Sequence, residues 1–205
     1  HDSFMRILIV GGGFAGLTNR ADIVSVGGKV SRGDLVMRAL RNVSARLAFD
    51  DLRELSGEDF NGFHLVIADK NSMYLLRGDG KSIERTAPRD RLLVISNRGI
   101  GLGEVISDDM PQRVKNILRV WNENLISERS PRVMTLSSLL HIHGGQEGTC
   151  INEPHDNYGT KSSSIIKMRS AGGDASWWYY HRERKSPDRH ICGEEFELLN
   201  TMRID

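Results

Sequence analysis

The sequence is short of several residue types and patterns, and each shortage excludes a class of protein. Its 205 residues include two cysteines, too few for the disulfide framework of a small secreted domain. The longest apolar run, Ile7–Val10, is far below the roughly 20 residues that a membrane-spanning helix needs. The formal net charge is +1, whereas general nucleic-acid binders carry a strongly basic face. We therefore expect no membrane span and no nucleic-acid partner, and a reducing compartment such as the cytoplasm.

The apolar material that is present suffices for a folded core. Hydrophobic residues make up 39% of the chain and charged residues 27%, proportions that are typical of globular and not of disordered proteins. Compact domains usually contain roughly 100–200 residues. We therefore predict a single domain over residues 1–205.

Apolar patterning predicts blocks of strands separated by helices. Ser31 can cap a helix that has Asp34 in its first turn, and a later helix begins near Pro111 with an apolar stripe from Val114 to Leu125. Short turns join the strands between residues 63 and 96, so these strands must pair antiparallel. The order indicates an α+β fold with antiparallel sheet covered by helices. The predicted strands are Phe4–Val10, Phe63–Ala68, Met73–Arg77, Arg91–Ser96, Ser162–Met168, Trp177–His181 and Phe196–Leu199.

A glycine-rich motif near the start has two interpretations. Gly11, Gly13 and Gly16 follow a predicted strand with the G-x-G-x-x-G spacing by which FAD- and NAD-binding oxidoreductases hold a pyrophosphate. That motif must open a helix of several turns, but Leu17–Val26 is β-branched and polar and is soon followed by a Gly-Gly turn. We therefore favour a β-hairpin between two antiparallel strands, and a FAD- or NAD-binding oxidoreductase is the alternative.

Four segments of the sequence, taken together, carry a family likeness. They are Phe14–Arg20, Ser31–Val36, Leu93–Gly99 and Tyr158–Ser164. The second resembles the family motif Ser-Arg-Gly-Glu-Leu-Val, and the last resembles Tyr-Gly-Thr-Arg-Ser-Ser-Thr. In this order they resemble the NRDE family, which includes the transport-and-Golgi-organisation-2 proteins. The resemblance covers residues 14 to about 170 and implies the four-layer αββα sandwich of the N-terminal nucleophile (Ntn) hydrolases, with which the predicted order of elements agrees.

The resemblance implies hydrolysis of a small amide or, as in the eukaryotic relatives, handling of haem or a lipid metabolite without catalysis. An enzyme of this type would be a C–N amide hydrolase with an N-terminal cysteine nucleophile, and NRDE proteins begin Met-Cys and soon continue into Asn-Arg-Asp-Glu. This sequence begins His1–Phe4, has no cysteine before Cys150 and contains no Asn-Arg-Asp-Glu. We therefore expect that the first strands of the family pattern are missing here, and whether the chain is an enzyme stays open.

Three residues are candidates for the site that the resemblance implies. Asn19 and Asn97 resemble the two asparagines that flank the nucleophile in bile-salt-hydrolase-like relatives, where amide donors would stabilise an oxyanion. Arg113 resembles the arginine near the nucleophile, which would hold the thiol and a substrate carboxylate by charge. The alternatives are turn formation for the asparagines and a solvated helix face for Arg113.

We expect no resident cofactor or metal, with a small molecule or haem as the ligand. His141 and His143 could belong to a haem or metal ligand set, but a histidine that complements a helix C-terminus is the simpler interpretation. Cys150 is predicted to be a small buried apolar residue rather than a nucleophile. The substrate and the oligomeric state are not specified by the sequence.

Overall fold

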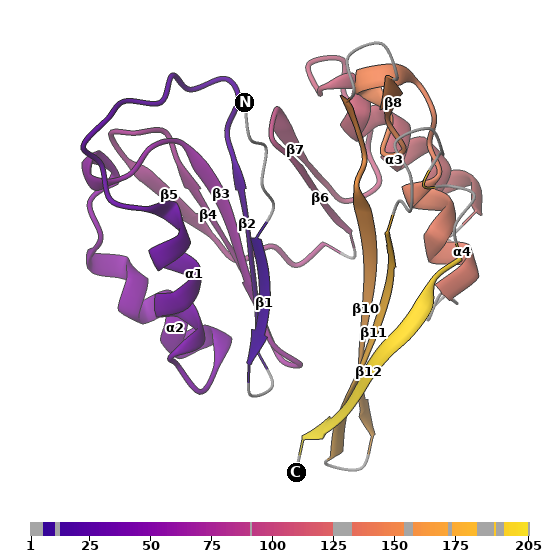
Figure 1. Cartoon of the computed structure of the whole chain (residues 1–205). Helices are drawn as coiled ribbons and strands as arrows, with labels where there is room; N and C mark the ends of the chain where they lie inside the picture. Colours follow the sequence, from indigo (N-terminus) through magenta and orange to yellow (C-terminus); the bar gives the residue numbers. More distant parts are fainter. Residues whose placement is uncertain are drawn as a thin grey trace. The chain divides into compact units, whose positions relative to one another are not determined.

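A computed structural model describes residues 6–10, 13–90, 92–124, 133–153, 158–171, 174–183, 191 and 195–204. The chain divides into two compact units, His1–Gly103 and Glu104–Asp205, which are described separately below (Figure 1). Both units combine helices with antiparallel strands, so the predicted α+β class is confirmed. The single domain over residues 1–205 and the four-layer Ntn-hydrolase sandwich stay predictions.

The first unit is built on a five-stranded antiparallel sheet with the strand order β1-β2-β3-β4-β5. Between β2 and β3 the chain leaves the sheet and forms the helices α1 (Arg32–Leu40) and α2 (Ala45–Asp51), which lie on one face of it (Figure 1). The strands are Arg6–Val10 (β1), Gly13–Asn19 (β2), Phe63–Ala68 (β3), Met73–Gly78 (β4) and Ile83–Thr86 (β5).

Serine residues start both helices. The Ser31 side chain accepts a hydrogen bond from the Gly33 amide, and Asp34 lies in the first turn of α1, which confirms the predicted cap. The Ser44 side chain caps α2 by accepting a hydrogen bond from the amide of Leu47. At the N-terminus of each helix, the serine thus satisfies a backbone amide that has no partner within the helix.

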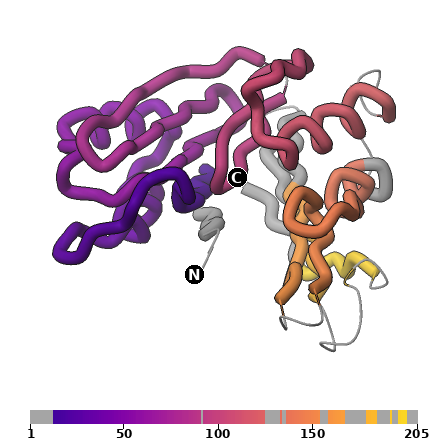
Figure 2. The backbone as a smooth tube through the Cα atoms, turned by 90° about the horizontal axis from the view of Figure 1, so that it is seen from above, coloured from indigo at the N-terminus to yellow at the C-terminus, as the bar shows by residue number. Residues whose placement is uncertain are grey.

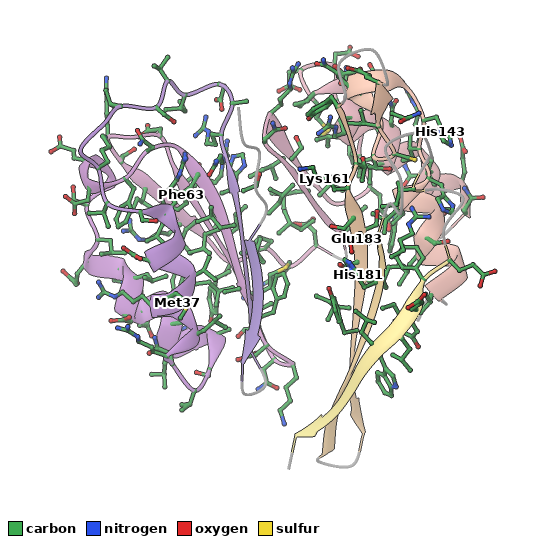
Figure 3. All side chains as sticks on the ribbon, in the orientation of Figure 1. Met37, Phe63, His143, Lys161, His181 and Glu183 are labelled. Carbon is green, nitrogen blue, oxygen red and sulfur yellow. The ribbon has the colours of Figure 1, made fainter. Side chains whose placement is uncertain are left out.

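The core of the first unit fills the space between the sheet and the helices. Alternate strand residues point to opposite faces, so Leu17 and Leu65 face the helices, where Leu35 of α1 meets them. All three side chains are almost fully buried. Phe63 is completely buried and lies edge-on to Phe60, with 6.1 Å between the ring centroids (Figure 3). Burial of each such side chain contributes about 1.5–3 kcal/mol.

The glycine-rich motif lies in a hairpin and does not open a helix. β1 and β2 pair antiparallel, with Val10 opposite Gly13 and Ile7 opposite Gly16. Gly16 is a buried residue inside a strand, so the motif lacks the helix N-terminus that would hold a pyrophosphate. The alternative of a FAD- or NAD-binding loop is therefore wrong for this chain, and the predicted hairpin is confirmed. Gly11 lies outside the described residues.

The strand predicted at 91–96 does not extend the meander. Its described part, β6 (Leu93–Ser96), pairs with β7 (Gly99–Leu102) in a separate two-stranded sheet. The hydroxyl of Ser96 stabilises the turn because it accepts hydrogen bonds from the amides of Arg98 and Gly99, both at 3.2 Å. The local sequence does not predict β7, because the glycines of this segment weaken the strand pattern.

The second unit contains a three-stranded antiparallel sheet with the order β10-β11-β12, formed by Ser162–Ala171, Asp174–Glu183 and Glu197–Ile204. The helices α3 (Gln112–Asn124) and α4 (Val133–Ser137) lie on one face of this sheet (Figures 1 and 2). The predicted stripe of α3 is confirmed at its buried positions, whereas Leu125 lies outside the described residues. These buried positions are Val114, Leu118 and Trp121.

A short connection in this unit is held by a residue of the Tyr158–Ser164 segment. The strands β8 (Asn152–Glu153) and β9 (Tyr158–Gly159) form a two-stranded ladder. Beside it the hydroxyl of Thr160 donates to the carbonyl of Thr149 and accepts from the amide of Ile151, both at 3.0 Å. Among the described helices, none combines the length and the apolar composition needed to cross a membrane.

Two glycines provide a matched test of packing in the first unit. A Cβ at Gly57 would lie 2.4 Å from backbone atoms of Ser82, whereas a Cβ at Gly27 meets nothing within 4 Å. We expect Gly57→Ala to lower the free energy of unfolding by about 1–3 kcal/mol, because the backbone must move to admit the methyl group. Gly27→Ala should stay within about 0.5 kcal/mol of the parent. Urea denaturation measures both, and equal effects would contradict the packing described here.

Candidate functional site

Two predicted site residues lie at the same end of the first unit. Asn19 is the last residue of β2, and Asn97 directly follows β6. The amide of Ala21, two residues after Asn19, donates a hydrogen bond of 2.7 Å to the carbonyl of Asn97. The fold therefore brings together two asparagines that are far apart in the sequence. Their role as amide donors to an oxyanion stays a prediction.

The Asn97 side chain carries a buried polar atom that could contact a ligand. Its Oδ1 is buried and has no hydrogen-bond partner. Leaving a buried acceptor without a partner costs about 1–3 kcal/mol, and such groups in native proteins point to a water, an ion or a ligand. A ligand with an N–H or O–H group could satisfy this oxygen.

His64 positions the residue before Asn97. Its side chain is 2% exposed, and its Nδ1 lies 3.2 Å from the carbonyl oxygen of Ser96. A carbonyl can only accept, so Nδ1 must carry the proton and donate it. Burial, followed by the charge of Arg20, lowers the pKa of His64 from 6.5 to about 4. The imidazole is thus neutral at pH 7, and its Nε2 carries the lone pair.

His64 is a buried residue at this site in addition to the predicted Asn19 and Asn97. The available signal was a histidine inside the otherwise apolar run Phe63–Ala68. A single histidine in such a run is compatible with an ordinary strand that has one polar side chain on its second face. The sequence predicts a strand that ends at Ser96, but it does not show that this strand lies next to His64. The register shows that His64 lies opposite Thr18 on β2 and Arg77 on β4, on the sheet face turned away from α1 and α2.

Cations hold the loop that follows Asn19. Arg20 forms an ion pair with Asp22 and donates to the carbonyl of Gly78 at 3.3 Å. The hydrogen bond between them raises the pKa of Arg20 and lowers the pKa of Asp22. Arg32 donates to the carbonyl of Gly62 at 2.9 Å, and burial lowers the pKa of this guanidinium. The backbone around Asn19 is therefore fixed by long-range contacts.

Lys29 also fixes the same loop by hydrogen bonds to the main chain. Its ammonium donates to the carbonyls of Phe60 and Gly80, at 3.3 and 2.9 Å. Lys29 and Arg32 thus donate to main-chain oxygens, which are uncharged and do not neutralise their positive charges. This end of the first unit consequently combines amide groups with cationic side chains.

Arg113, the third predicted residue, lies on α3 in the second unit. Its guanidinium donates to the carbonyl of Gln146, while its Nε is buried and has no partner. On the same helix, Asn116 donates to the carbonyl of Glu147 at 3.2 Å. Both side chains therefore fasten the short helical turn Gly145–Glu147 against α3. A role of Arg113 in binding a thiol or a carboxylate stays a prediction.

Cys150 differs from its expected state. It is buried as predicted, at 2% exposed, but it is disulfide-bonded. Its sulfur therefore cannot serve as a thiolate nucleophile. The reducing compartment stays a prediction. The second cysteine, Cys192, lies outside the described residues.

His141 has a structural partner in the second unit. It ends the short helical turn Ser138–Leu140, and its Nε2 accepts a hydrogen bond from the guanidinium of Arg182. Burial, followed by the charge of Arg182, lowers the pKa of His141. An imidazole that already accepts from an arginine through Nε2 has that lone pair occupied, which argues against this nitrogen as a haem or metal ligand.

A comparison with models of protein families gives a match for this chain. A family model described as Transport and Golgi organisation 2 matches residues 10–179. This range covers most of the chain and contains all four segments on which the sequence resemblance rests. It also contains Asn19, Asn97, His64 and Arg113. No curated protein matches the chain.

The depressed pKa of His64 predicts a pH dependence of stability. The folded state disfavours protonation of this imidazole, so its contribution is fully present above pH 6.5 and is lost as the pH falls from 6.5 towards 4. A shift of this size corresponds to about 3 kcal/mol. Urea denaturation at pH 7, 5.5 and 4.5 should therefore show a steeper loss for the parent than for His64→Gln. Parallel curves for the two proteins would contradict a buried neutral His64.

Proposed function

The chain belongs to the Transport and Golgi organisation 2 family, and we propose that it binds haem or a lipid metabolite without catalysis. The proposed site is the end of the first unit where Asn19 and Asn97 meet. We call this region the asparagine site, and it comprises Asn19, Asn97, Ser96 and His64.

The observation that carries this proposal is the unpartnered Oδ1 of Asn97. The backbone carbonyl of the same residue is occupied by the amide of Ala21, and the preceding carbonyl is occupied by His64. The main chain on both sides is thus satisfied and fixed, while the side-chain acceptor is left for another molecule. A fixed, unsatisfied group is favourable for binding because little conformational freedom is lost when a ligand arrives.

The charges nearby favour a ligand that has a carboxylate. Arg32 and Lys29 hold main-chain oxygens around this end of the sheet, and their positive charges attract an anion. Haem carries two propionates, and a fatty acid carries one carboxylate. Both ligands therefore combine an apolar body with an anionic group. A protonated carboxyl or another hydroxyl on the ligand could also donate to the oxygen of Asn97.

We propose binding rather than amide hydrolysis as the role of the asparagine site because its four residues, Asn19, Asn97, Ser96 and His64, include no cysteine. The Ntn-type hydrolase implied by the resemblance needs a cysteine thiolate. Cys150 is engaged in a disulfide, so its sulfur is not available as that thiolate. The asparagine amides could polarise a carbonyl, but they cannot attack it.

Ligand titrations with two asparagine variants test this function. Haem binding is followed by the Soret band, and dodecanoate binding by calorimetry. We expect Asn97→Ala to lower the affinity for the ligand by about tenfold or more, since a buried hydrogen bond is lost. The control is Asn71→Ala, because Asn71 lies in the exposed turn after β3 and uses its backbone amide to bond Asp69.

The outcomes separate the two ligand classes and the proposal itself. Binding of haem alone identifies the haem-handling role, and binding of dodecanoate alone identifies the lipid role. If neither ligand binds the parent, the proposed function is wrong. If Asn97→Ala binds the ligand as well as the parent and the control Asn71→Ala do, the asparagine site is not the site of ligand binding.

A further inference from the structure

The second unit carries a cluster of hydroxyl and imidazole groups that the proposed function does not use. The Oγ of Ser164 lies 2.9 Å from Nδ1 of His181. The hydroxyl of Tyr179 lies 3.2 Å from the same nitrogen and 3.3 Å from Ser164 Oγ. We call these three residues the Ser164 cluster. Each is half-buried, and His181 is labelled on β11 in Figure 3.

The sheet register holds the Ser164 cluster in place. Ser164 on β10 is the direct cross-strand partner of His181 on β11. Tyr179 lies two residues before His181, on the same face, and its ring stacks on the imidazole with 5.8 Å between centroids. Arg182 reaches the carbonyl of Leu140 on the helical side, so the alternation of side chains places the cluster on the opposite face.

The neighbouring strand is irregular beside the cluster. The register of β12 against β11 shifts between Tyr179 and Tyr180. Such bulges are over-represented next to active sites, where they redirect side chains. The observation is independent of the three hydrogen-bond distances and marks the same part of the sheet.

The Ser164 hydroxyl differs from a structural hydroxyl in the same sequence segment. Thr160 bonds main-chain groups with its hydroxyl, donating to one carbonyl and accepting from one amide. Ser164 instead contacts a phenol and an imidazole. An imidazole within hydrogen-bond reach of a serine hydroxyl is the arrangement that activates a serine as a nucleophile.

We propose that Ser164 is a nucleophile toward carboxylic esters and that His181 is its general base. Nδ1 of His181 takes the proton of Ser164 as Oγ bonds to the acyl carbon. The bond to the alkoxy group then breaks, and the leaving oxygen takes that proton from His181. Water hydrolyses the acyl-serine with His181 again as base, which releases the acid and restores Ser164. The phenol of Tyr179 is a donor beside the reacting oxygen.

The surroundings indicate the type of acyl group. Ile166 follows Ser164 on the same face of β10, is half-buried and is the cross-strand partner of Tyr179. An aliphatic side chain and an aromatic ring therefore lie next to the nucleophile. This composition suits a small apolar acyl group better than a charged one. The inference concerns the second unit and does not depend on ligand binding at the asparagine site.

The test uses the full chain with two probes, p-nitrophenyl acetate and a fluorophosphonate. The fluorophosphonate should add to one residue of the parent, and peptide mass spectrometry should place it on Ser164. Ser164→Ala should abolish this labelling and lower p-nitrophenyl acetate hydrolysis by about 100-fold. The matched control is Ser162→Ala, which alters an exposed serine on the same strand and should leave both readouts unchanged.

Two further variants separate catalysis from structural support. His181→Ala should lose about 100-fold in ester hydrolysis and regain part of it with added imidazole, which a purely structural role would not permit. Tyr179→Phe should lose about tenfold or more, whereas Tyr180→Phe should behave as the parent. Thermal unfolding of each variant shows whether it is folded.

Several results would overturn the proposal. They are the absence of labelling in the parent, a label mapped to a residue other than Ser164, and equal hydrolysis by the Ser164→Ala and Ser162→Ala variants. If Ser164→Ala fails to fold, Ser164→Cys takes its place. That variant should react with iodoacetamide at residue 164 faster than at other positions, and its failure to do so would also contradict an activated nucleophile.

Discussion

The antiparallel register of β2 between β1 and β3 is the constraint on which the first unit depends. It sets Leu17 opposite Leu65 on the helical face and Thr18 opposite His64 on the other face. A slip of one residue would exchange these faces and expose the core. The same register turns the glycine-rich motif into strand, with Gly16 buried between its neighbours. A single pairing pattern thus determines both the core and the absence of a pyrophosphate loop at this motif.

The register also connects the core to the asparagine site. His64 lies on β3 in a buried position, and its Nδ1 donates a hydrogen bond to the carbonyl of Ser96. Since neutral imidazole is favoured there, the bond has a fixed direction, with His64 as the donor. Ser96 precedes Asn97, and Asn97 accepts in turn from Ala21. The carbonyls of two successive residues at the start of the β6–β7 turn are therefore hydrogen-bonded to the rest of the unit, which leaves the backbone of Asn97 little freedom.

Local patterns in the sequence predicted the parts of the fold that local physics determines. The cap at Ser31, the stripe of α3 and the hairpin strands β3 and β4 follow from residue spacing, and the structure contains them. The separate pairing of β6 with β7 and the contact of His64 with Ser96 depend on residues far apart in the chain, which no local pattern encodes. The Ser164 cluster is similar, because it exists only through the register of β10 and β11.

In the proposed binding site, His64 would act on ligand affinity by fixing the backbone before Asn97. A double-mutant cycle on haem or dodecanoate affinity, with His64→Gln, Asn97→Ala and the pair at pH 7, measures that coupling most directly. We expect His64→Gln to weaken binding in the parent and to have little further effect once Asn97 is alanine. Strictly additive losses in binding free energy would show that the two residues act independently, and His64 would then have no role in orienting Asn97.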